Sequence, residues 1–485
     1  MIKKLHYLPP FFIALAPAVF LWSNNFAEIF PREVFPTLVA IIVFAGIVLG
    51  VFWLFYRNLD KAAIVASVFL LFLFSFQYIF YNDLAPWLMR YRWAFLLCLF
   101  IIIGAGYAIK KTKRDLSPTV QVITIVSGVF ILISLLQLGG NLYVNYKQEE
   151  PTGVATVATS KIDQMRDIYY IILDEYSAPW VLKEVMGFEK IDQATTFLKE
   201  RGFFLAELSQ SNYSSTEPSL VSSLNMRYLD ETERQKIRPS AIEDHFLKDF
   251  FRSRGYQYLH FGADWTTYFN RYADENINIY YFSPYQMVVW ETTAFAPLER
   301  FLGGRGFIAK KFGFLHRRFT QWQRVQFKLE ELAKVPERKE GPIFVFAHFL
   351  IPHGPYVFDA DGNFLTKEEV AERSEVENYL GQVEYINKEM EVLVDELLEK
   401  SEPEPIIIIQ GDHGFRFPDD PELLEDLSLE SDQAADLAYP ILNAYYFPDG
   451  GDEILYESIT PVNSFRVLLN YYFDQELDLL EDKTY

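Results

Sequence analysis

The sequence is poor in cysteine, with only Cys98 among 485 residues, and it has fewer basic than acidic side chains. A single cysteine excludes an internal disulfide framework and a zinc site built from cysteines. The formal net charge of -21 argues against a general nucleic-acid binder, which needs a basic face. Half of the residues are hydrophobic, which excludes a disordered chain.

The charge is unevenly distributed along the chain. Residues 1–150 carry a net charge of +5, whereas the remainder carries -26. The first part is apolar and slightly basic, and the second is polar and strongly acidic. We therefore expect a membrane domain at residues 1–147, a linker at 148–165 and a second domain at 166–485.

Five apolar runs lie in the first part, at residues 8–22, 34–56, 62–81, 93–109 and 120–144. A membrane-spanning helix needs about 20 apolar residues. The second, third and fifth runs meet this length, the fourth is at the lower limit, and the first is short and rich in proline. The pattern predicts an all-α domain of about five transmembrane helices.

Loop charges indicate the orientation of these helices. If the N-terminus is cytoplasmic, eight lysines and arginines fall on the inside and four on the outside, as the positive-inside rule favours. The second domain is then extracytoplasmic, on a multi-pass protein of the cell membrane. No acidic residue lies within the runs, so a transporter is the least favoured function. The simplest role for this part is an anchor, and the alternative is lipid handling by its aromatic faces.

Short apolar strands alternate with helical patterns in the second part. Buried strands are predicted at residues 168–173, 256–261, 343–348 and 406–410. Helices are predicted at residues 191–201, 242–254 and 375–398. Continuous β-branched runs between helices predict an α/β domain whose sheet is mostly parallel and covered on both faces.

Polar clusters follow three of these strands directly. Asp174 and Glu175 follow the first, Pro352 and His353 follow the third, and Asp412-His413-Gly414 follows the last. In open α/β sheets, binding sites form at the carboxyl ends of the strands. We therefore expect the three clusters to meet at one edge of the sheet.

Two of the clusters have the composition of a metal site. Asp412 offers a hard oxygen and His413 a borderline nitrogen, which suits zinc, manganese or a similar divalent ion. The glycines on either side let the backbone turn tightly and approach a ligand. Asp174 is a further candidate ligand, with Glu175 as a possible second acid. The alternative role for this acidic pair is a helix N-cap.

A hydroxyl-rich segment at residues 212–219 supplies candidate nucleophiles. Ser214, Ser215 and Thr216 each carry a hydroxyl that a metal can activate. The alternative is a solvated loop whose hydroxyls cap a helix. The residues alone do not choose among the three hydroxyls.

Three histidines and one arginine complete the candidate residues. His353 sits between prolines in a loop, where it can donate a proton to a leaving group or bind an anionic oxygen. His348 and His260 each end a strand, where a core role and a role in the pocket are both open. Arg416 can hold an anionic ester, or it is solvated at the surface.

Five stretches in this order resemble the alkaline phosphatase/sulfatase superfamily: IYYIILDEYSAP, SNYSSTEPSLVSSLNM, HFLIPHGPYVFDADG, IIIIQGDHGF and ITPVNSFRVLLNYYF. The similarity is to its membrane-anchored sulfatase-like branch, near lipoteichoic acid synthase and the phosphoethanolamine transferases. It covers residues 166–485, and the five-span anchor also looks like that of lipoteichoic acid synthase. The resemblance implies an alkaline-phosphatase-like fold.

The resemblance also implies roles for individual residues. Thr216 is the best match to the nucleophile, which is also a metal ligand in such enzymes, and Ser214 and Ser215 are its rivals. Glu175 falls where sulfatases place a second acid that lipoteichoic acid synthase does not use, so one metal and two metals both stay open. The remaining matched positions are Asp174, Asp412 and His413 as metal ligands and His353 as the substrate-contacting histidine.

One departure from the sulfatase pattern bears on the chemistry. The Cys/Ser-x-Pro-x-Arg motif that is matured to formylglycine is absent, which favours phosphoryl chemistry by an unmodified threonine. The expected function is a transferase or hydrolase that acts on phospho-esters of lipids or envelope glycans. We expect this activity to depend on a divalent metal ion, which is Mn, Mg, Zn or Ca. The alternatives are a sulfuric ester hydrolase and a catalytically silent envelope protein that binds a polymer or a partner.

Overall fold

The computed structural model describes residues 7–26, 29, 31–80, 91–148, 165–237, 240–263, 267–279, 282–296, 317–338, 341–417, 424–425, 427 and 429–485. The chain forms two compact units. The first comprises Met1–Thr152 and Phe282–Gly313, and the second comprises residues 153–281 and 314–485. The linker expected at 148–165 lies, except for its two end residues, outside the described residues.

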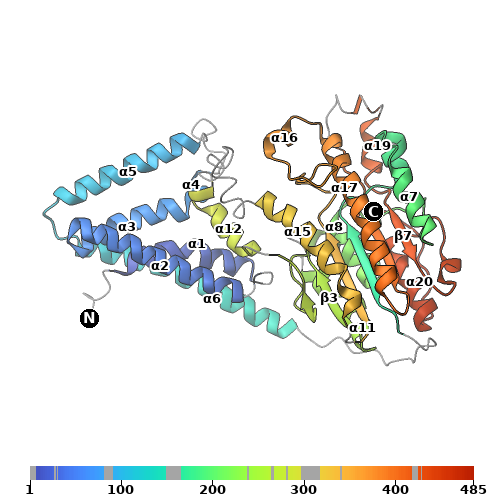
Figure 1. Cartoon of the computed structure of the whole chain (residues 1–485). Coiled ribbons are helices and arrows are strands. Elements are labelled where there is room, and N and C mark those ends of the chain that lie inside the picture. The colour runs from blue at the N-terminus through green and yellow to red at the C-terminus, as the bar shows by residue number, and fades with distance from the viewer. Residues whose placement is uncertain are drawn as a thin grey trace. The chain divides into compact units, whose positions relative to one another are not determined.

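The first unit is all α-helical, as the sequence predicts (Figure 1). Its N-terminal helices are α1 (Leu8–Asn24), α2 (Pro31–Tyr56), α3 (Leu59–Phe74), α4 (Phe76–Phe80), α5 (Tyr91–Lys111) and α6 (Ser117–Gln148). Among the residues that the structure describes, three segments are long and apolar enough to cross a membrane: Pro31–Tyr56, Trp93–Lys111 and Ser117–Tyr143. Only 17% of the most apolar window of each is buried within the protein, as expected for helices that present apolar side chains to lipid.

The third apolar run differs from its prediction. Residues 62–81 were expected to form one spanning helix, but the described part breaks at Ser75, whose backbone leaves the helical region. The 16-residue α3 ends there, and the five-residue α4 follows. At the other end of α3, the Lys61 ammonium donates to the carbonyls of Lys110 and Thr112, which are left unpaired at the end of α5.

A helix from the second half of the chain also belongs to the first unit. Helix α12 (Pro284–Thr292) begins with a capping box formed by Ser283 and Gln286. The Tyr285 side chain is 2% exposed, and its hydroxyl donates to the carbonyl of Ala18 in α1. Sequence analysis assigned this stretch to the 166–485 domain, whereas its side chains pack against the N-terminal helices.

The second unit is built on one seven-stranded sheet of order β2-β7-β6-β1-β5-β3-β4. The five strands from β6 to β4 are parallel, and β7 is antiparallel to both of its neighbours. This confirms the predicted α/β fold with a mostly parallel sheet. The strands are β1 (Ile168–Leu173), β2 (Phe204–Leu205), β3 (Gln257–Phe261), β4 (Glu275–Asn276), β5 (Ile343–Phe349), β6 (Ile406–Gly411) and β7 (Asn443–Tyr446).

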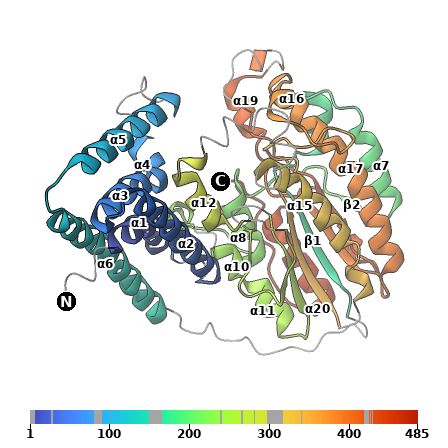
Figure 2. The ribbon, with the colours of Figure 1, turned by 60° about the vertical axis from the view of Figure 1, so that its left-hand side comes forward.

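Both faces of the sheet are covered by helices, because alternate side chains of the buried strands point into two separate cores. One face packs against α7 (Ile191–Glu200), α15 (Arg317–Leu332) and α17 (Glu375–Lys400). Figure 2 shows α15 and α17 along this face. The other face packs against α8 (Thr216–Asn225), α11 (Phe246–Arg252) and α20 (Pro461–Phe473). The shorter helices are α9 (Glu231–Lys236), α10 (Ser240–Glu243), α16 (Lys367–Ala371) and α19 (Ser431–Asp436).

The predicted helix at residues 242–254 is divided in the structure. His245 has an extended backbone between α10 and α11, and its ring nitrogen Nδ1 accepts from the backbone N–H of Lys248. This contact makes His245 the N-cap of α11. The apolar periodicity continues from α10 into α11, although the helix is interrupted at His245. The other predicted helices and strands agree with the structure to within two residues at their ends.

Candidate active site

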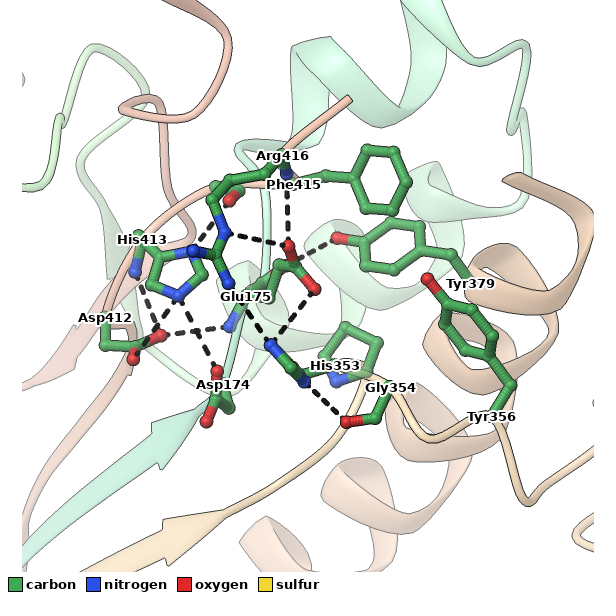
Figure 3. A network of polar contacts seen from close by, with 12 residues as sticks. Asp174, Glu175, His353, Gly354, Tyr356, Tyr379, Asp412, His413, Phe415 and Arg416 are labelled. Carbon is green, nitrogen blue, oxygen red and sulfur yellow. Dashed lines mark hydrogen bonds and ion pairs between the residues drawn. The ribbon is translucent and has the colours of Figure 1, made fainter. Parts of the chain in front are cut away.

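The predicted polar clusters meet at the carboxyl edge of the sheet. Strands β6, β1 and β5 are neighbours, and Leu173 at the end of β1 pairs with Gly411 on one side and Phe349 on the other. The residues that follow these strands therefore share one edge. The structure brings together the candidates that follow them, Asp174, Glu175, His353, Asp412, His413 and Arg416 (Figure 3).

Asp174, Asp412 and His413 form the centre of this group. One potential ligand atom from each lies within 4.8 Å of the others. His413 Nε2 is 3.7 Å from Asp174 Oδ1 and 3.8 Å from Asp412 Oδ2. None of the three residues is more than 2% exposed.

Each of these three side chains has one polar atom that forms a hydrogen bond and one that forms none among the described residues. Asp412 Oδ1 accepts from the backbone N–H groups of Glu175 and His413, both at 2.9 Å. His413 Nδ1 donates to the carbonyl of Gly414 at 2.8 Å, which leaves the lone pair on Nε2. Asp174 Oδ2 accepts from His348 at 3.1 Å.

The atoms left over are Asp174 Oδ1, Asp412 Oδ2 and His413 Nε2, which are buried and have no hydrogen-bond partner among the described residues. Unpaired polar atoms at such depth are rare and unfavourable. Two carboxylate oxygens and one imidazole nitrogen are the donor set that divalent zinc or manganese prefers. The residues present therefore fit a divalent cation.

The local charges keep Asp174 ionised. Burial would raise its pKa, but the hydrogen bond from His348 and the positive charge of His353 lower it below its ordinary value. The centre therefore carries negative charge in a place from which water is excluded.

The glycines of the Gly411-Asp412-His413-Gly414 turn lie close to neighbouring backbone. Both allow other backbone segments to approach closely. A Cβ atom on Gly411 would lie 2.4 Å from the carbonyl oxygen of Tyr176, and one on Gly414 would lie 2.6 Å from that of Leu437. The turn is thus packed against neighbouring backbone.

We expect Gly411→Ala to destabilise the second unit by about 1–3 kcal/mol, because backbone atoms must move to accept the methyl group. The midpoint of denaturant unfolding of the full chain in detergent measures this loss. Gly381→Ala in α17 is the matched control, since its Cβ meets backbone atoms only at 3.8 Å or more. The control is expected to gain up to about 1 kcal/mol from helix propensity. Equal midpoints for the two variants would contradict this account of Gly411.

Glu175 faces away from the three-residue centre. Its φ of 64° lies in the left-handed region, which is uncommon for a residue with a side chain. In this conformation its backbone N–H points to Asp412, while its carboxylate accepts from the Arg416 backbone N–H at 3.1 Å. Burial raises its pKa. Glu175 is therefore tied to Arg416 rather than to the three unpaired atoms.

His353 lies between the acids and Arg416. Its Nδ1 donates to the Gly354 carbonyl, and Nε2 is 3.9 Å from Glu175 Oε2 and 3.4 Å from Arg416 Nη2. Burial would lower the pKa of His353, but the carboxylates of Asp174 and Glu175 raise it above its ordinary value. Arg416 has a half-exposed side chain, so its guanidinium is open to a ligand from solvent.

Thr216 is the first residue of α8, and Ser215 is the N-cap. The segment before it lies at the carboxyl edge, because Gln210 forms a bridge with Pro440 and Ser177 forms one with Ile441. The far end of α8 lies over the middle of the sheet, where Ser223 bonds to Tyr170. In the part of the chain that the structure describes, the Thr216 hydroxyl forms no hydrogen bond.

His260 lies inside the protein rather than in an open pocket. It is 1% exposed, and its Nε2 donates to the carbonyl of Thr267. Burial lowers its pKa to about 4, so the ring is neutral. It reaches the candidate site only through Thr267 and His348.

Tyr379 is a residue of the site that sequence reasoning missed. Its hydroxyl donates to the Glu175 carbonyl at 2.8 Å and accepts from the Ser177 N–H at 3.1 Å. These contacts hold the turn that follows Asp174. The only signal in the sequence is the apolar face of the predicted helix, which marks Tyr379 as a core residue and not as a support for the site.

A family model described as Sulfatase matches residues 166–465, which span all of the candidate residues. This match confirms the resemblance seen in the sequence. No curated protein sequence matches the chain.

Several solved structures are similar to this chain. The integral membrane protein lipooligosaccharide phosphoethanolamine transferase A (EptA) from Neisseria meningitidis is 14% identical, with 95% of this chain and 94% of that chain covered and a TM-score of 0.43. The periplasmic domain of EptC from Escherichia coli, in complex with Zn, is 12% identical over 66% and 86%, with a TM-score of 0.41. The lipoteichoic acid synthase LtaP from Listeria monocytogenes is 13% identical over 68% and 78%, with a TM-score of 0.43. Similarity this distant concerns the fold alone.

Proposed function

Because the chain belongs to the sulfatase family, we propose that it is a membrane-anchored, metal-dependent enzyme acting on phospho-esters of lipids or envelope glycans outside the cytoplasm. The observation that carries the proposal is the set of three buried, unpaired atoms on Asp174, Asp412 and His413. A catalytically silent protein has no need to maintain such a set, which disfavours folding unless a cation neutralises it.

Asp174, Asp412 and His413 would hold the metal, and Thr216 is proposed as a further ligand. When bound, a divalent ion at this place supplies electrostatic stabilisation of negative charge and lowers the pKa of a nearby hydroxyl. The backbone N–H groups on Asp412 and the Gly414 carbonyl on His413 fix the orientation of these two side chains.

Thr216 is the proposed nucleophile. Its hydroxyl loses its proton to water, and the oxygen attacks the phosphorus atom of the ester. The bond from phosphorus to the substrate alcohol breaks, and that alcohol leaves with a proton from His353. Water or an acceptor alcohol then attacks the threonine ester, takes the phosphoryl group and frees Thr216. Its position at the start of a ten-residue helix favours negative charge on the attacking oxygen, since the helix dipole is positive at that end. Ser214 and Ser215 are the rival nucleophiles.

His353 and Arg416 are proposed to act on the substrate. Arg416 binds the anionic oxygens through its half-exposed guanidinium. His353 has a raised pKa, and its Nε2 is the atom that can pass a proton to the leaving oxygen. Glu175 orients both side chains and is not needed as a metal ligand in this scheme.

Two features support the choice of substrate class. Thr216-Glu217-Pro218-Ser219 is followed by Leu220 and not by arginine, so the segment departs from the formylglycine pattern and favours phosphoryl over sulfuryl chemistry. The apolar helices would keep the catalytic unit close to lipid-linked substrates, and the distribution of basic residues between the loops supports an extracytoplasmic catalytic unit.

The proposal is tested with the full chain purified in detergent. Metal content is measured after dialysis against Mn, Mg, Zn and Ca, and turnover is measured on matched aryl phosphodiester and aryl sulfate substrates. We expect one bound metal or more and hydrolysis of the phosphodiester that stops on chelation. Preferential cleavage of the sulfate would favour a sulfuric ester hydrolase. No bound metal, together with no turnover, would favour the silent binding protein.

We expect kcat/KM for the phosphodiester to fall as the pH rises through the raised pKa of His353. The raised pKa of His353 keeps its ring protonated above the ordinary range, and the proton donor is lost as the pH passes through that value. In His353→Gln, kcat/KM is expected to be about 10²-fold lower than in the wild type. It should also no longer fall as the pH rises. His245→Gln, which changes a buried histidine in the N-cap of α11, should keep the wild-type profile. An unchanged alkaline limb in His353→Gln would refute the assignment.

A further inference from the structure

His348 has no role in the function proposed above, yet its side chain contacts one of the three central residues. It lies on β5, one residue before the end of the strand, and is 1% exposed. Its Nε2 is 3.1 Å from Asp174 Oδ2. Because a carboxylate only accepts hydrogen bonds, His348 Nε2 carries the hydrogen in this contact.

The other nitrogen of the His348 ring is held by the loop that follows β3. Thr267 Oγ1 is 2.7 Å from His348 Nδ1, and it accepts from the backbone N–H of Ala263 at 3.1 Å. In an imidazole that carries its single hydrogen on Nε2, Nδ1 accepts, so the Thr267 hydroxyl donates its hydrogen to Nδ1. The result is a directed chain from the Ala263 backbone through Thr267 and His348 to Asp174.

This chain determines which oxygen of Asp174 is left for a cation. Oδ2 is occupied by His348, while Oδ1 has no partner and lies 3.7 Å from His413 Nε2. Without His348, rotation about the side-chain bonds of Asp174 would exchange the two oxygens or turn both away from His413. The carbonyl of His348 is itself held by the buried Lys328 ammonium, so the strand cannot easily shift to compensate.

We propose that His348 is a positioning residue for the metal: it orients Asp174 through Nε2, and Thr267 keeps its ring in the required tautomer. The inference rests on the proposed function, because it requires that Asp174 holds a cation. Hydrogen-bonding partners of metal ligands typically contribute about 10–100-fold to metal affinity. His348 should therefore affect metal binding itself, before any substrate is present.

The test measures the dissociation constant for Mn²⁺ on the full chain in detergent, by the loss of the free-ion electron paramagnetic resonance signal. We expect His348→Leu to bind Mn²⁺ about 10–100-fold more weakly than the wild type. His348→Gln, whose amide N–H can take the place of Nε2–H, should recover most of the affinity. His245→Leu removes another buried histidine, the N-cap of α11, and it should lower the unfolding temperature without changing the Mn²⁺ affinity.

The possible outcomes separate the inference from the proposed function. Wild-type Mn²⁺ affinity in folded His348→Leu would overturn the positioning role while leaving the metal site intact. Absence of Mn²⁺ binding in the wild type and every variant, together with no bound metal in the dialysis experiment, would overturn the proposed function as well. Should His348→Leu not fold, Thr267→Val and Thr267→Ser replace it, because valine removes the hydroxyl and serine keeps it. Weaker binding in the valine variant alone supports the proposal, and equal binding in both overturns it.

Discussion

Thr216→Ala is expected to reduce kcat on the phosphodiester substrate by about 10³-fold or more, because no other group replaces the attacking oxygen. The fold should survive, since the Thr216 hydroxyl forms no hydrogen bond among the described residues and Ser215, not Thr216, is the N-cap of α8. The change in unfolding free energy is expected to stay within about 0.5 kcal/mol. Single-turnover kinetics of the full chain in detergent measure the rate.

The neighbouring hydroxyls provide the controls for this result. Ser214→Ala and Ser215→Ala remove the rival nucleophiles and should retain most of the turnover. Thr216→Ser keeps a hydroxyl at the same position and should retain measurable turnover. Mass spectrometry of the quenched wild-type reaction should find the ester on Thr216. Full turnover by Thr216→Ala, or an ester on either serine, would reject the threonine assignment.

Asp412→Asn is expected to abolish metal-dependent activity and, at the same time, to leave the metal-free protein at least as stable as the wild type. Asparagine keeps an oxygen for the N–H groups of Glu175 and His413. Its amide replaces the unpaired Oδ2, and one of two buried negative charges disappears. Because one metal ligand is removed, the stabilisation that a metal gives the wild type should vanish. For the same reason, kcat should fall by about 10³-fold or more.

The measurement is thermal unfolding of both proteins with and without the metal that the dialysis experiment identifies. Asp395→Asn is the matched control, because Asp395 is half exposed and pairs with Arg201 on the surface. It changes the charge by the same amount and should keep the wild-type response to metal. A wild-type metal response in Asp412→Asn would show that Asp412 does not hold the ion.

The centre of the site could be predicted because the sequence pattern of the strands before it is easy to recognise. Strands β1, β5 and β6 are uninterrupted apolar runs, and they are adjacent in the sheet. Once such runs are accepted as parallel strands, the residues that follow them must meet at one edge. The meeting of Asp174, Asp412 and His413 required no knowledge of side-chain conformation.

Features that depend on local backbone or side-chain conformation could not be predicted. The direction of the Glu175 carboxylate follows from a φ of 64°, and the tie between His348 and Asp174 follows from a rotamer. Neither leaves a periodic pattern in the sequence. Strands β2 and β7 are only two and four residues long, too short for a period-two signal to stand out.

The break at Ser75 was missed for a similar reason. Ser67 lies within the same helix, so a serine in this run does not by itself show that α3 ends at Ser75. The division between α10 and α11 depends on the capping contact of His245, which a hydrophobic pattern does not contain.

The position of α12 has a consequence for the covalent path of the chain. The backbone passes between the two units near residues 152, 281 and 313, so three covalent connections join them. Cutting only the segment after α6 leaves the units linked. A shortened chain that starts at residue 166 would carry Tyr285, Val289 and Phe295 without the helices against which they pack. We therefore expect a water-soluble version of the second unit to need a short polar loop in place of residues 282–313, in addition to removal of the N-terminal helices.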